Sequence, residues 1–217
     1  MILVTGGAGF IGSNFILDWM AGSDEPVVGL DQLTYAGKLD NLAGVEGDPR
    51  HRFVHGDIND SAPNNHGRFQ FPEKLISLML TNALAGKSLP VYGDGEQVRD
   101  WLHVSDHCAA IRRVLQAGQP RQVYNIGGNS EMSNLNLVQL LCDILDRLQP
   151  AARSRREQIA FVADRPGHDR RYAIDAGNMR RELGWQPAHA FESGLEHTVR
   201  WYLAHPDWVA HIERRQA

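Results

Sequence analysis

The chain has 217 residues with 22 basic and 26 acidic side chains and a net charge of −4, which allows one medium domain or two small ones and argues against a nucleic-acid partner. The sequence opens on a strand pattern without a charged leader or a long apolar run, so we expect a cytoplasmic protein with no membrane span. Cys108 and Cys142 lie in apolar helical patterns, and we expect both as free thiols in the core.

A glycine-rich turn follows the first predicted strand. Residues 2–5 are a short apolar run typical of a buried strand, and the glycine-rich residues 6–12 lead into a helical pattern that continues to Met20. Gly6 permits the tight turn, Gly9 lets the backbone approach a pyrophosphate, and Gly12 lets the helix pack against its strand. Phosphates would then meet the unpaired N–H groups at the helix N-terminus.

An acidic residue completes a dinucleotide-binding pattern. The second predicted strand, residues 26–30, is followed by Asp31, whose carboxylate can bind the ribose hydroxyls of NAD and would repel the 2′-phosphate of NADP. A third strand, residues 51–55, leads to Asp57 and Ile58, which suit the adenine edge. Strand, helix and acid in this order predict a doubly wound α/β sheet that binds NAD. The alternative is that the glycines serve only turns.

Helices and strands alternate in the second half. We expect helices over residues 73–85, 105–117, 133–147 and 175–184 and one that carries Leu195 to Leu203, with strands over 89–92 and 123–126. Ser105 is expected to cap the second of these helices. The arginine-rich segment 149–158 is expected to be a solvated loop.

Seven blocks of sequence carry a specific resemblance. They are residues 6–12, 31–37, 64–67, 70–75, 89–95, 98–101 and 164–172. Together they resemble the extended short-chain dehydrogenases and, more narrowly, the dTDP-glucose 4,6-dehydratases. The resemblance implies a truncated doubly wound (Rossmann-type) parallel sheet with a smaller α/β substrate-binding lobe. Residues 1–60 would be the N-terminal half of the NAD-binding domain, and residues 61–217 the nucleotide-sugar lobe with the remaining Rossmann-associated elements.

A dTDP-sugar requires guanidinium groups for its diphosphate, an apolar platform for its base and short polar groups for its sugar. By resemblance, the NAD-binding residues are Gly6, Gly9, Phe10, Ile11, Gly12, Asp31, Gln32, Leu33, Thr34, Asp57, Ile58 and Asn65. The substrate-binding residues are Asn64, Lys74, Leu75, Pro90, Val91, Tyr92, Arg99, Asn134, Asp164, Arg165, Pro166, Gly167 and His168. Taken one at a time, solvated arginines and a packed tyrosine are the ordinary alternative.

One position departs from the family's pattern, and one pair of histidines raises a metal-dependent alternative. His66 stands where the family usually has tyrosine, and with Arg68 it makes that loop more polar. His103 and His107 have helical ligand spacing, but no acidic motif accompanies them, so we predict no metal site.

The residues for the family's chemistry are absent. The implied reaction moves hydride from sugar C4 to NAD, eliminates water across C5 and C6, and returns the hydride to C6. This chemistry requires a tyrosine base, a lysine four residues after it, and an acidic pair. None of the five tyrosines is followed by a lysine four residues later; they are Tyr35, Tyr92, Tyr124, Tyr172 and Tyr202. The pair Asp24-Glu25 fits a turn. We therefore predict no catalytic residue, and a junction between Asp57 and Asn64 that replaces roughly a hundred or more residues, including the fourth to sixth strands.

This junction should strain the fold. With strand order 3-2-1-4-5-6, loss of strands four to six leaves the first strand with an unpaired edge and an uncovered apolar face. The ends of strands three and six would lie about 24 Å apart, whereas the six steps from Ile58 to Asn64 reach only about 20 to 22 Å. We therefore expect the halves to shift, or the polypeptide to contain more than this sequence.

Three functions remain open. The first is an internally deleted dehydratase of a deoxysugar pathway, such as that of a rhamnose precursor, which binds NAD and a dTDP-sugar with little or no turnover. The second is an active dehydratase, an NAD-dependent lyase, whose catalytic segment is omitted from this sequence. The third is a non-enzymatic nucleotide-sugar binding module. The family's usual homodimer is in doubt because its helices fall in the missing region.

Overall fold

A computed structural model describes residues 1–31, 33, 37–55, 64–70, 73–119, 122 and 124–214. The first half forms β1 (Ile2–Thr5), α1 (Phe10–Gly22), β2 (Val27–Asp31), the 3₁₀ helix η1 (Leu39–Val45) and β3 (His51–His55). These three strands are parallel in the order β1-β2-β3. The three predicted strands are therefore confirmed, with the second shifted by one residue.

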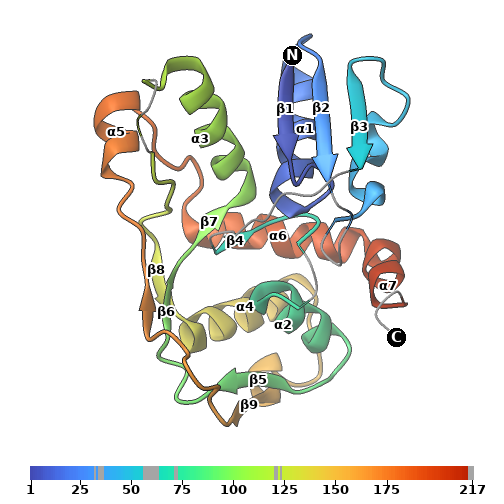
Figure 1. Ribbon diagram of the computed structural model, residues 1–217. Coiled ribbons are helices and arrows are strands. Elements are labelled where there is room, and N and C mark those ends of the chain that lie inside the picture. The colour runs from blue at the N-terminus through green and yellow to red at the C-terminus, as the bar shows by residue number, and fades with distance from the viewer. Residues whose placement is uncertain are drawn as a thin grey trace.

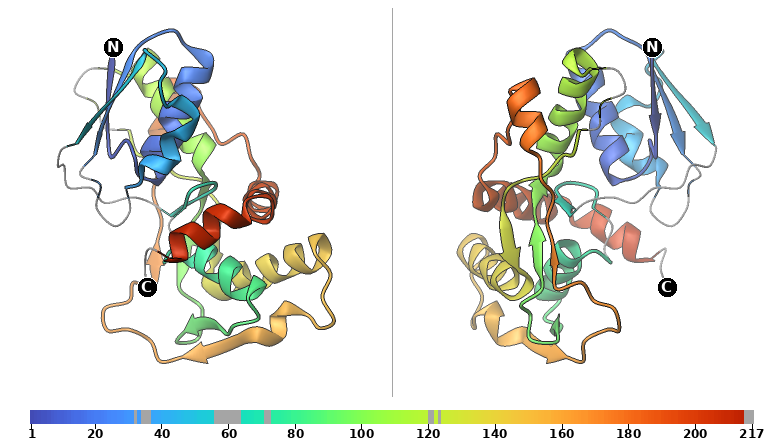
Figure 2. Two further views of the ribbon diagram at one scale, coloured as in Figure 1. Left: turned by 90° about the vertical axis from the view of Figure 1, so that its right-hand side faces the viewer. Right: turned by 60° about the vertical axis from the view of Figure 1, so that its left-hand side comes forward.

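The sheet is covered on one face only. Ile2, Val4, Val27 and Phe53 pack into one cluster with α1. Side chains alternate between faces along a strand, so Leu3, between Ile2 and Val4, points to the opposite face, where it is 61% exposed. Figure 2 shows the described helices on a single side of this sheet. The predicted open edge and uncovered face of the first strand are both confirmed within the described residues.

The second half forms a lobe that lies partly beside this sheet and partly below it (Figure 1). Its elements are β4 (Asn65–His66), α2 (Leu75–Leu84), β5 (Leu89–Tyr92), β6 (Val98–Asp100), β7 (Leu102–His103), α3 (Val104–Ala117), β8 (Glu131–Ser133), α4 (Asn134–Leu148), η2 (Arg155–Gln158), β9 (Ile159–Val162), β10 (Arg171–Tyr172), α5 (Gly177–Leu183), α6 (Phe191–Ala204) and α7 (Pro206–Arg214). The strands pair as β10-β6-β8, β4-β7 and β5-β9.

Two cores hold the lobe together. The larger one lies where α2, α4 and α6 meet, around the fully buried Leu80, Leu141 and Val199. A smaller one joins α3 to α5 through Ala110 and Met179. Both cysteines are free and buried, as predicted.

The two halves touch along α1 and α3. Arg68, just after β4, donates to Asn14 and to Asp18, with 2.8 Å between its Nη2 and the Asp18 Oδ1. Arg112 of α3 lies 4.9 Å from the ring of Trp19 on α1. Arg68 thus links the halves.

Three local predictions were wrong. Tyr124 to Ile126 do not form a strand, because no neighbouring strand is described for them to pair with. His103, not Ser105, caps α3, since its ring accepts from the Ser105 N–H. The segment 149–158 is not simply solvated, because Arg155 is buried and its Nη1 lies 2.8 Å from Asp146.

None of the helices in the described part of the chain combines the length and apolar character needed to cross a membrane.

Candidate functional site

The glycine turn has the geometry of a phosphate-binding turn. Gly6 has φ of +64°, which favours glycine. A Cβ on Gly12 would lie 2.1 Å from the Gly6 carbonyl oxygen, so no side chain fits there. Gly9 is the N-cap of α1, and no side chain caps that helix. Its first N–H groups therefore remain available for an anion.

Asp31 lies at the end of β2, against this turn. Its Oδ2 accepts from the Ala8 N–H at 2.9 Å and its Oδ1 from the Leu33 N–H at 2.8 Å. Each carboxylate oxygen has a second lone pair for a ribose hydroxyl. The predicted glycines and acid are thus brought together at one end of the sheet, with Phe10 and Ile11 in the first turn of α1.

The remaining predicted cofactor residues are placed less directly. Gln32, Thr34, Asp57 and Ile58 lie outside the described residues. Asn65 is only 2% exposed, and its Oδ1 lies 3.0 Å from His107 Nδ1. A contact between Asn65 and NAD stays a prediction.

Predicted substrate residues from three distant segments converge in the lower lobe. Gln97 of the segment before β6 donates to Asp164 Oδ2 at 2.9 Å. Gln97 also accepts, through its backbone oxygen, from the N–H of Asn134 at 3.0 Å. The ring of His168 meets that of Tyr92 edge-on at 6.3 Å, and its Nδ1 lies 2.7 Å from Asp164. Residues 92, 97, 134, 164 and 168 thus form one site.

Arg99 and Arg165 bring two positive charges to this site. Burial lowers the pKa of Arg99, and the nearby charge of Arg165 lowers it further, while Asp169 opposes both effects. Arg99 Nη1 donates to the Val98 carbonyl at 2.8 Å, and neither guanidinium has a carboxylate within ion-pair distance in the described chain. Two guanidinium groups that form no close ion pair suit a bound diphosphate.

Buried acceptors without partners lie in the same region. The side-chain oxygens of Gln97 and Asn134 are buried and have no hydrogen-bond partner among the described residues. Such atoms are costly unless a ligand or water satisfies them. The site therefore offers cations for an anion and acceptors for hydroxyl or N–H groups.

The other predicted substrate residues sit around this site or beside it. Pro90 and Val91 are in β5, which pairs with β9. Pro166 and Gly167 belong to the same loop as Asp164, with Gly167 at φ +71°. Lys74 and Leu75 lie at the start of α2, and Asn64 precedes β4, where its carbonyl accepts from Leu102. In the described part of the chain, no hydrogen bond or ion pair joins Asn64, Lys74 or Leu75 to Arg99 or Arg165.

Two residues that contribute to these sites were not predicted. Gln97 acts on Asp164, 67 residues away, and His107 acts on Asn65, 42 residues away. Gln97 lies in a segment whose sequence predicts a loop, and His107 lies within a predicted helix. No local sequence pattern therefore indicates either role.

Two of the described tyrosines make hydrogen bonds within the fold. Tyr202 is buried, its hydroxyl donates to the Gln70 carbonyl at 2.7 Å, and burial raises its pKa. The Tyr124 hydroxyl donates to Glu182 at 3.0 Å. Asp24 and Glu25 are exposed before β2, where Glu25 pairs with the N-terminal amine, which supports their interpretation as turn residues.

Four histidines cluster between β4, β7 and α6. The rings of His66 and His103 lie 5.3 Å apart, those of His103 and His189 4.6 Å, and those of His189 and His197 5.6 Å. Asp106 Oδ1 lies 3.0 Å from His189 Nδ1. Within the described ranges, no three or more His, Cys, Asp or Glu side chains are placed to hold a metal ion.

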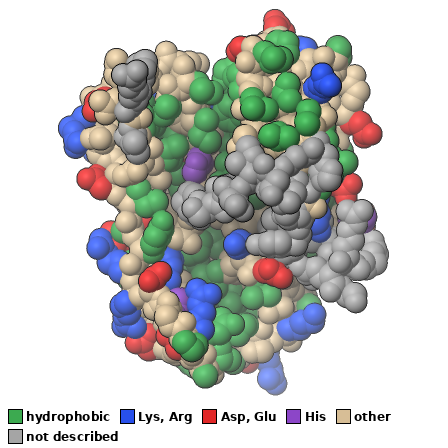
Figure 3. All heavy atoms as spheres, in the orientation of Figure 1, with side chains coloured by type: hydrophobic (Ala, Val, Ile, Leu, Met, Phe, Trp, Pro, Cys, Tyr) green, Lys and Arg blue, Asp and Glu red, His purple; other side chains and the backbone are tan. Residues whose placement is uncertain are grey.

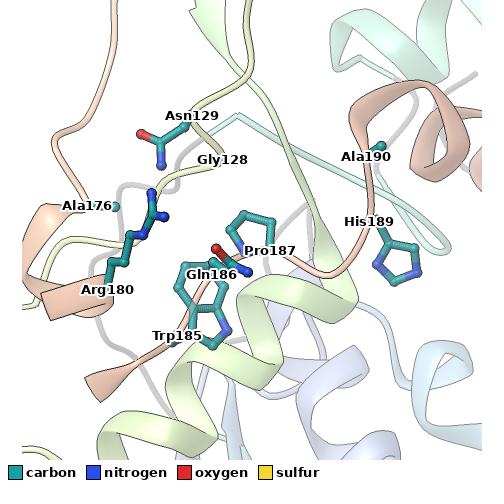
Figure 4. A pocket seen from close by; sticks show the side chains of 9 residues that line it. All are labelled: Gly128, Asn129, Ala176, Arg180, Trp185, Gln186, Pro187, His189 and Ala190. Atoms are coloured by element: carbon teal, nitrogen blue, oxygen red, sulfur yellow. The ribbon is translucent and has the colours of Figure 1, made fainter. Parts of the chain in front are cut away.

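A pocket of about 270 Å³ lies elsewhere, beside α5 (Figure 4). It is lined by Gly128, Asn129, Ala176, Arg180, Trp185, Gln186, Pro187, His189 and Ala190. None of these is a predicted cofactor or substrate residue. The converging residues above, and not this pocket, are therefore the candidate site.

The family of the chain follows from its relatives. The family model described as GDP-mannose 4,6 dehydratase matches residues 3–66 and 62–198. The two matched blocks meet next to the predicted junction, as expected of a family member that lacks an internal segment.

Alignments with individual relatives also indicate that this chain lacks an internal segment. A dTDP-glucose 4,6-dehydratase of Xanthomonas campestris pv. campestris is 37% identical over 331 positions, which cover 95% of this chain and 94% of the relative. These 331 positions outnumber the 217 residues of the chain by 114. A dTDP-glucose 4,6-dehydratase of Salmonella typhimurium is 55% identical over 156 residues, 72% of this chain but only 43% of that enzyme.

Solved structures correct one expectation. The dTDP-glucose 4,6-dehydratase of Bacillus anthracis in complex with NAD has a TM-score of 0.85 at 32% identity, covering 95% of this chain and 97% of that one. The Streptomyces venezuelae DesIV double mutant with NAD and DAU bound has a TM-score of 0.87 at 32% identity, covering 96% and 98%. A match over both halves at once contradicts the expected shift between them.

The expectation failed because the reach of the connection was counted from Ile58 and not from His55, the last residue of the third strand. β3 ends at His55, so nine steps lead to Asn64, with a reach of about 30 to 32 Å. That exceeds the separation of about 24 Å between the ends of strands three and six. The fold is therefore a doubly wound α/β fold with an internal deletion, and the chain belongs to the dTDP-glucose 4,6-dehydratase family.

Proposed function

We propose that this chain is an internally deleted dTDP-glucose 4,6-dehydratase that binds NAD and a dTDP-sugar with little or no turnover. The observation that carries the sugar-nucleotide part is that Arg99 and Arg165 lie near each other and that neither guanidinium group forms an ion pair with a described carboxylate. They lie beside the unsatisfied acceptors of Gln97 and Asn134. In this proposal the arginines hold the diphosphate, and Tyr92 with Pro90 and Val91 frames the base.

The glycine turn fits the NAD part of the proposal. The uncapped start of α1 would face the pyrophosphate, and Asp31 would accept from the ribose hydroxyls. When bound, NAD supplies hydride acceptance in this family. The residues described here orient the cofactor but move no proton, because no tyrosine with a lysine four residues on is present in the sequence.

Equilibrium binding tests this proposal. Isothermal titration of the purified chain with dTDP and, separately, with NAD should give saturable binding of one ligand each per chain. UDP and GDP should bind more weakly than dTDP, because the base platform is built for thymine. A folded, monodisperse chain that binds neither dTDP nor NAD would remove the proposal.

An active enzyme is the second candidate, and the match of both halves to complete dehydratases favours it. It requires the catalytic segment to be part of the polypeptide. An intact mass well above 24.2 kDa would support it, and a mass of 24.2 kDa would end it. The cytoplasmic location and the doubtful homodimer belong to the same proposal and await cell fractionation and light scattering.

A further inference from the structure

The first strand of the sheet has a free edge. Among the described residues, β1 is the outer strand of the order β1-β2-β3, and its four residues pair in parallel only with β2. A strand edge of this kind presents unpaired N–H and C=O groups that can accept another strand. β1 is therefore open to extension of the sheet.

The face of the sheet away from α1 is also open and apolar. Leu3 is paired with Val28, and Thr5 with Leu30, which is paired with Val54. Leu3 is 61% exposed, and Val28, Leu30 and Val54 are partly exposed. Figure 3 shows hydrophobic side chains over the strands that face the viewer. A parallel sheet normally has helices on both faces, and no helix of the described residues covers this one.

The two halves of this chain are arranged as in complete dehydratases. The two halves together match complete dehydratases at TM-scores of 0.85 and 0.87. The alignment to the Xanthomonas relative has 114 more positions than the chain has residues. In the order 3-2-1-4-5-6, three strands would follow β1 at its free edge.

We propose that the edge of β1 and the open face of the β1-β2-β3 sheet are a docking surface for a separate polypeptide. This partner is a segment of about a hundred residues that adds parallel strands beside β1 and covers the open face with helices. The proposal rests on the deletion stated in the proposed function, but it does not depend on ligand binding. A second copy of this chain fits less well, because a two-fold axis would place its β1 antiparallel and leave both open faces without helices.

Co-expression tests the proposal. The chain is produced together with the segment of the Xanthomonas campestris dehydratase that has no counterpart here, and the products are analysed by native mass spectrometry. We expect a complex with one copy of each. Hydrogen exchange at residues 2–5 should slow at least tenfold in that complex. A chain recovered alone, or as a homodimer, would overturn the proposal.

A matched pair of variants locates the surface. Leu3 and Phe161 are strand residues with 61% and 59% exposure, and they lie in strands at opposite ends of the molecule (Figure 1). Leu3→Lys should weaken the complex at least tenfold, and Phe161→Lys should leave it within twofold of the unsubstituted chain. Equal effects would contradict docking at β1.

A single-chain version guards against a segment that fails to fold alone. The same segment is inserted between Asp57 and Asn64, and exchange at residues 2–5 is measured again. If hydrogen exchange at residues 2–5 slows in the single-chain version but the separate chains form no complex, docking of a separate polypeptide would be overturned. No protection in either would overturn the surface itself. Because neither readout uses NAD or dTDP, failure here is distinguishable from failure of the proposed function.

Discussion

At the level of single side chains, Arg99 and Arg165 are the proposed ligands of the diphosphate. Replacement Arg99→Met removes a charged donor and keeps much of the side-chain volume. Loss of a charge-assisted hydrogen bond of about 1.5 to 3 kcal/mol should weaken dTDP binding about 10- to 100-fold. Arg170→Met is the matched control, because Arg170 already pairs with Asp94 at 2.7 Å. Calorimetric titration of both variants checks this, and equal losses would contradict the assignment.

Asp31 should set the preference for NAD over NADP. Asp31→Asn removes the negative charge that repels a 2′-phosphate but keeps a side-chain oxygen near the Ala8 N–H. We expect weaker NAD binding and tighter NADP binding, so that the ratio of the two dissociation constants changes about tenfold or more, roughly 1.4 kcal/mol. Titration with both cofactors measures the ratio. An unchanged ratio would show that Asp31 does not face the ribose.

His103 should make the fold less stable in mild acid. Burial, helped by the charge of His189, lowers its pKa to about 4, whereas an unfolded histidine has a pKa of about 6.5. Between pH 6.5 and 4 the unfolded chain therefore binds the proton more strongly. The free energy of unfolding should fall as pH is lowered through this window, by at most about 1.4 kcal/mol per pH unit for this residue.

Replacement His103→Asn tests this dependence. Asparagine is a good N-cap and can still accept from the Ser105 N–H. Denaturant unfolding at pH 7 and pH 5 should show a smaller loss of stability in His103→Asn than in the unsubstituted chain. His66, whose pKa burial lowers well below its usual value, should retain the rest of the loss. Identical losses would exclude His103 as a contributor.

The residues that could be predicted from sequence share a local signature. Gly12 and Asp31 follow from spacing within one strand-turn-helix-strand unit. Arg99 and Arg165 came only from the resemblance, since a single arginine carries no spacing signal. Gln97 and His107 could not be predicted, because each acts through a partner far away in the sequence.

At the level of elements, the turn between β1 and α1 depends on Gly12. In Gly12→Ala the new Cβ would lie 2.1 Å from the Gly6 carbonyl oxygen. The turn must open, at a cost of about 1 to 3 kcal/mol, and NAD binding should be lost. Gly44→Ala is the control, since its Cβ would meet only the flexible Leu17 side chain at 3.2 Å. Thermal unfolding with and without NAD distinguishes the two, and similar behaviour of both variants would contradict the role of Gly12.

The longer elements were predictable and the short strands were not. α1, α4 and α6 show clear helical patterns, and β3 was predicted with its observed bounds. β4, β7 and β10 have two residues each, too few for any alternation to show. Residues 124–126 have a strand-like sequence but do not form a strand. Such a pattern needs a neighbouring strand to pair with, and none is described beside them.

At the level of the whole molecule, the missing segment could be predicted from the sequence, but the unchanged arrangement of the two halves could not. The expected shift of the halves came from counting the connecting residues from Ile58, although the third strand was predicted to end at residue 55. Because β3 ends at His55, the connection is long enough for the halves to keep the family's arrangement. Such an arrangement preserves separate cofactor and sugar-nucleotide residues while the tyrosine, lysine and acidic pair for the chemistry are missing from the sequence.

Binding without turnover is the central claim, and one experiment tests it directly. The chain, with its mass of 24.2 kDa verified, is mixed in excess over dTDP-glucose with NAD present, and bound and free nucleotides are analysed by mass spectrometry over several hours. We predict that dTDP-glucose is retained by the protein unchanged. Formation of the 4-keto-6-deoxy product by this chain would contradict the account.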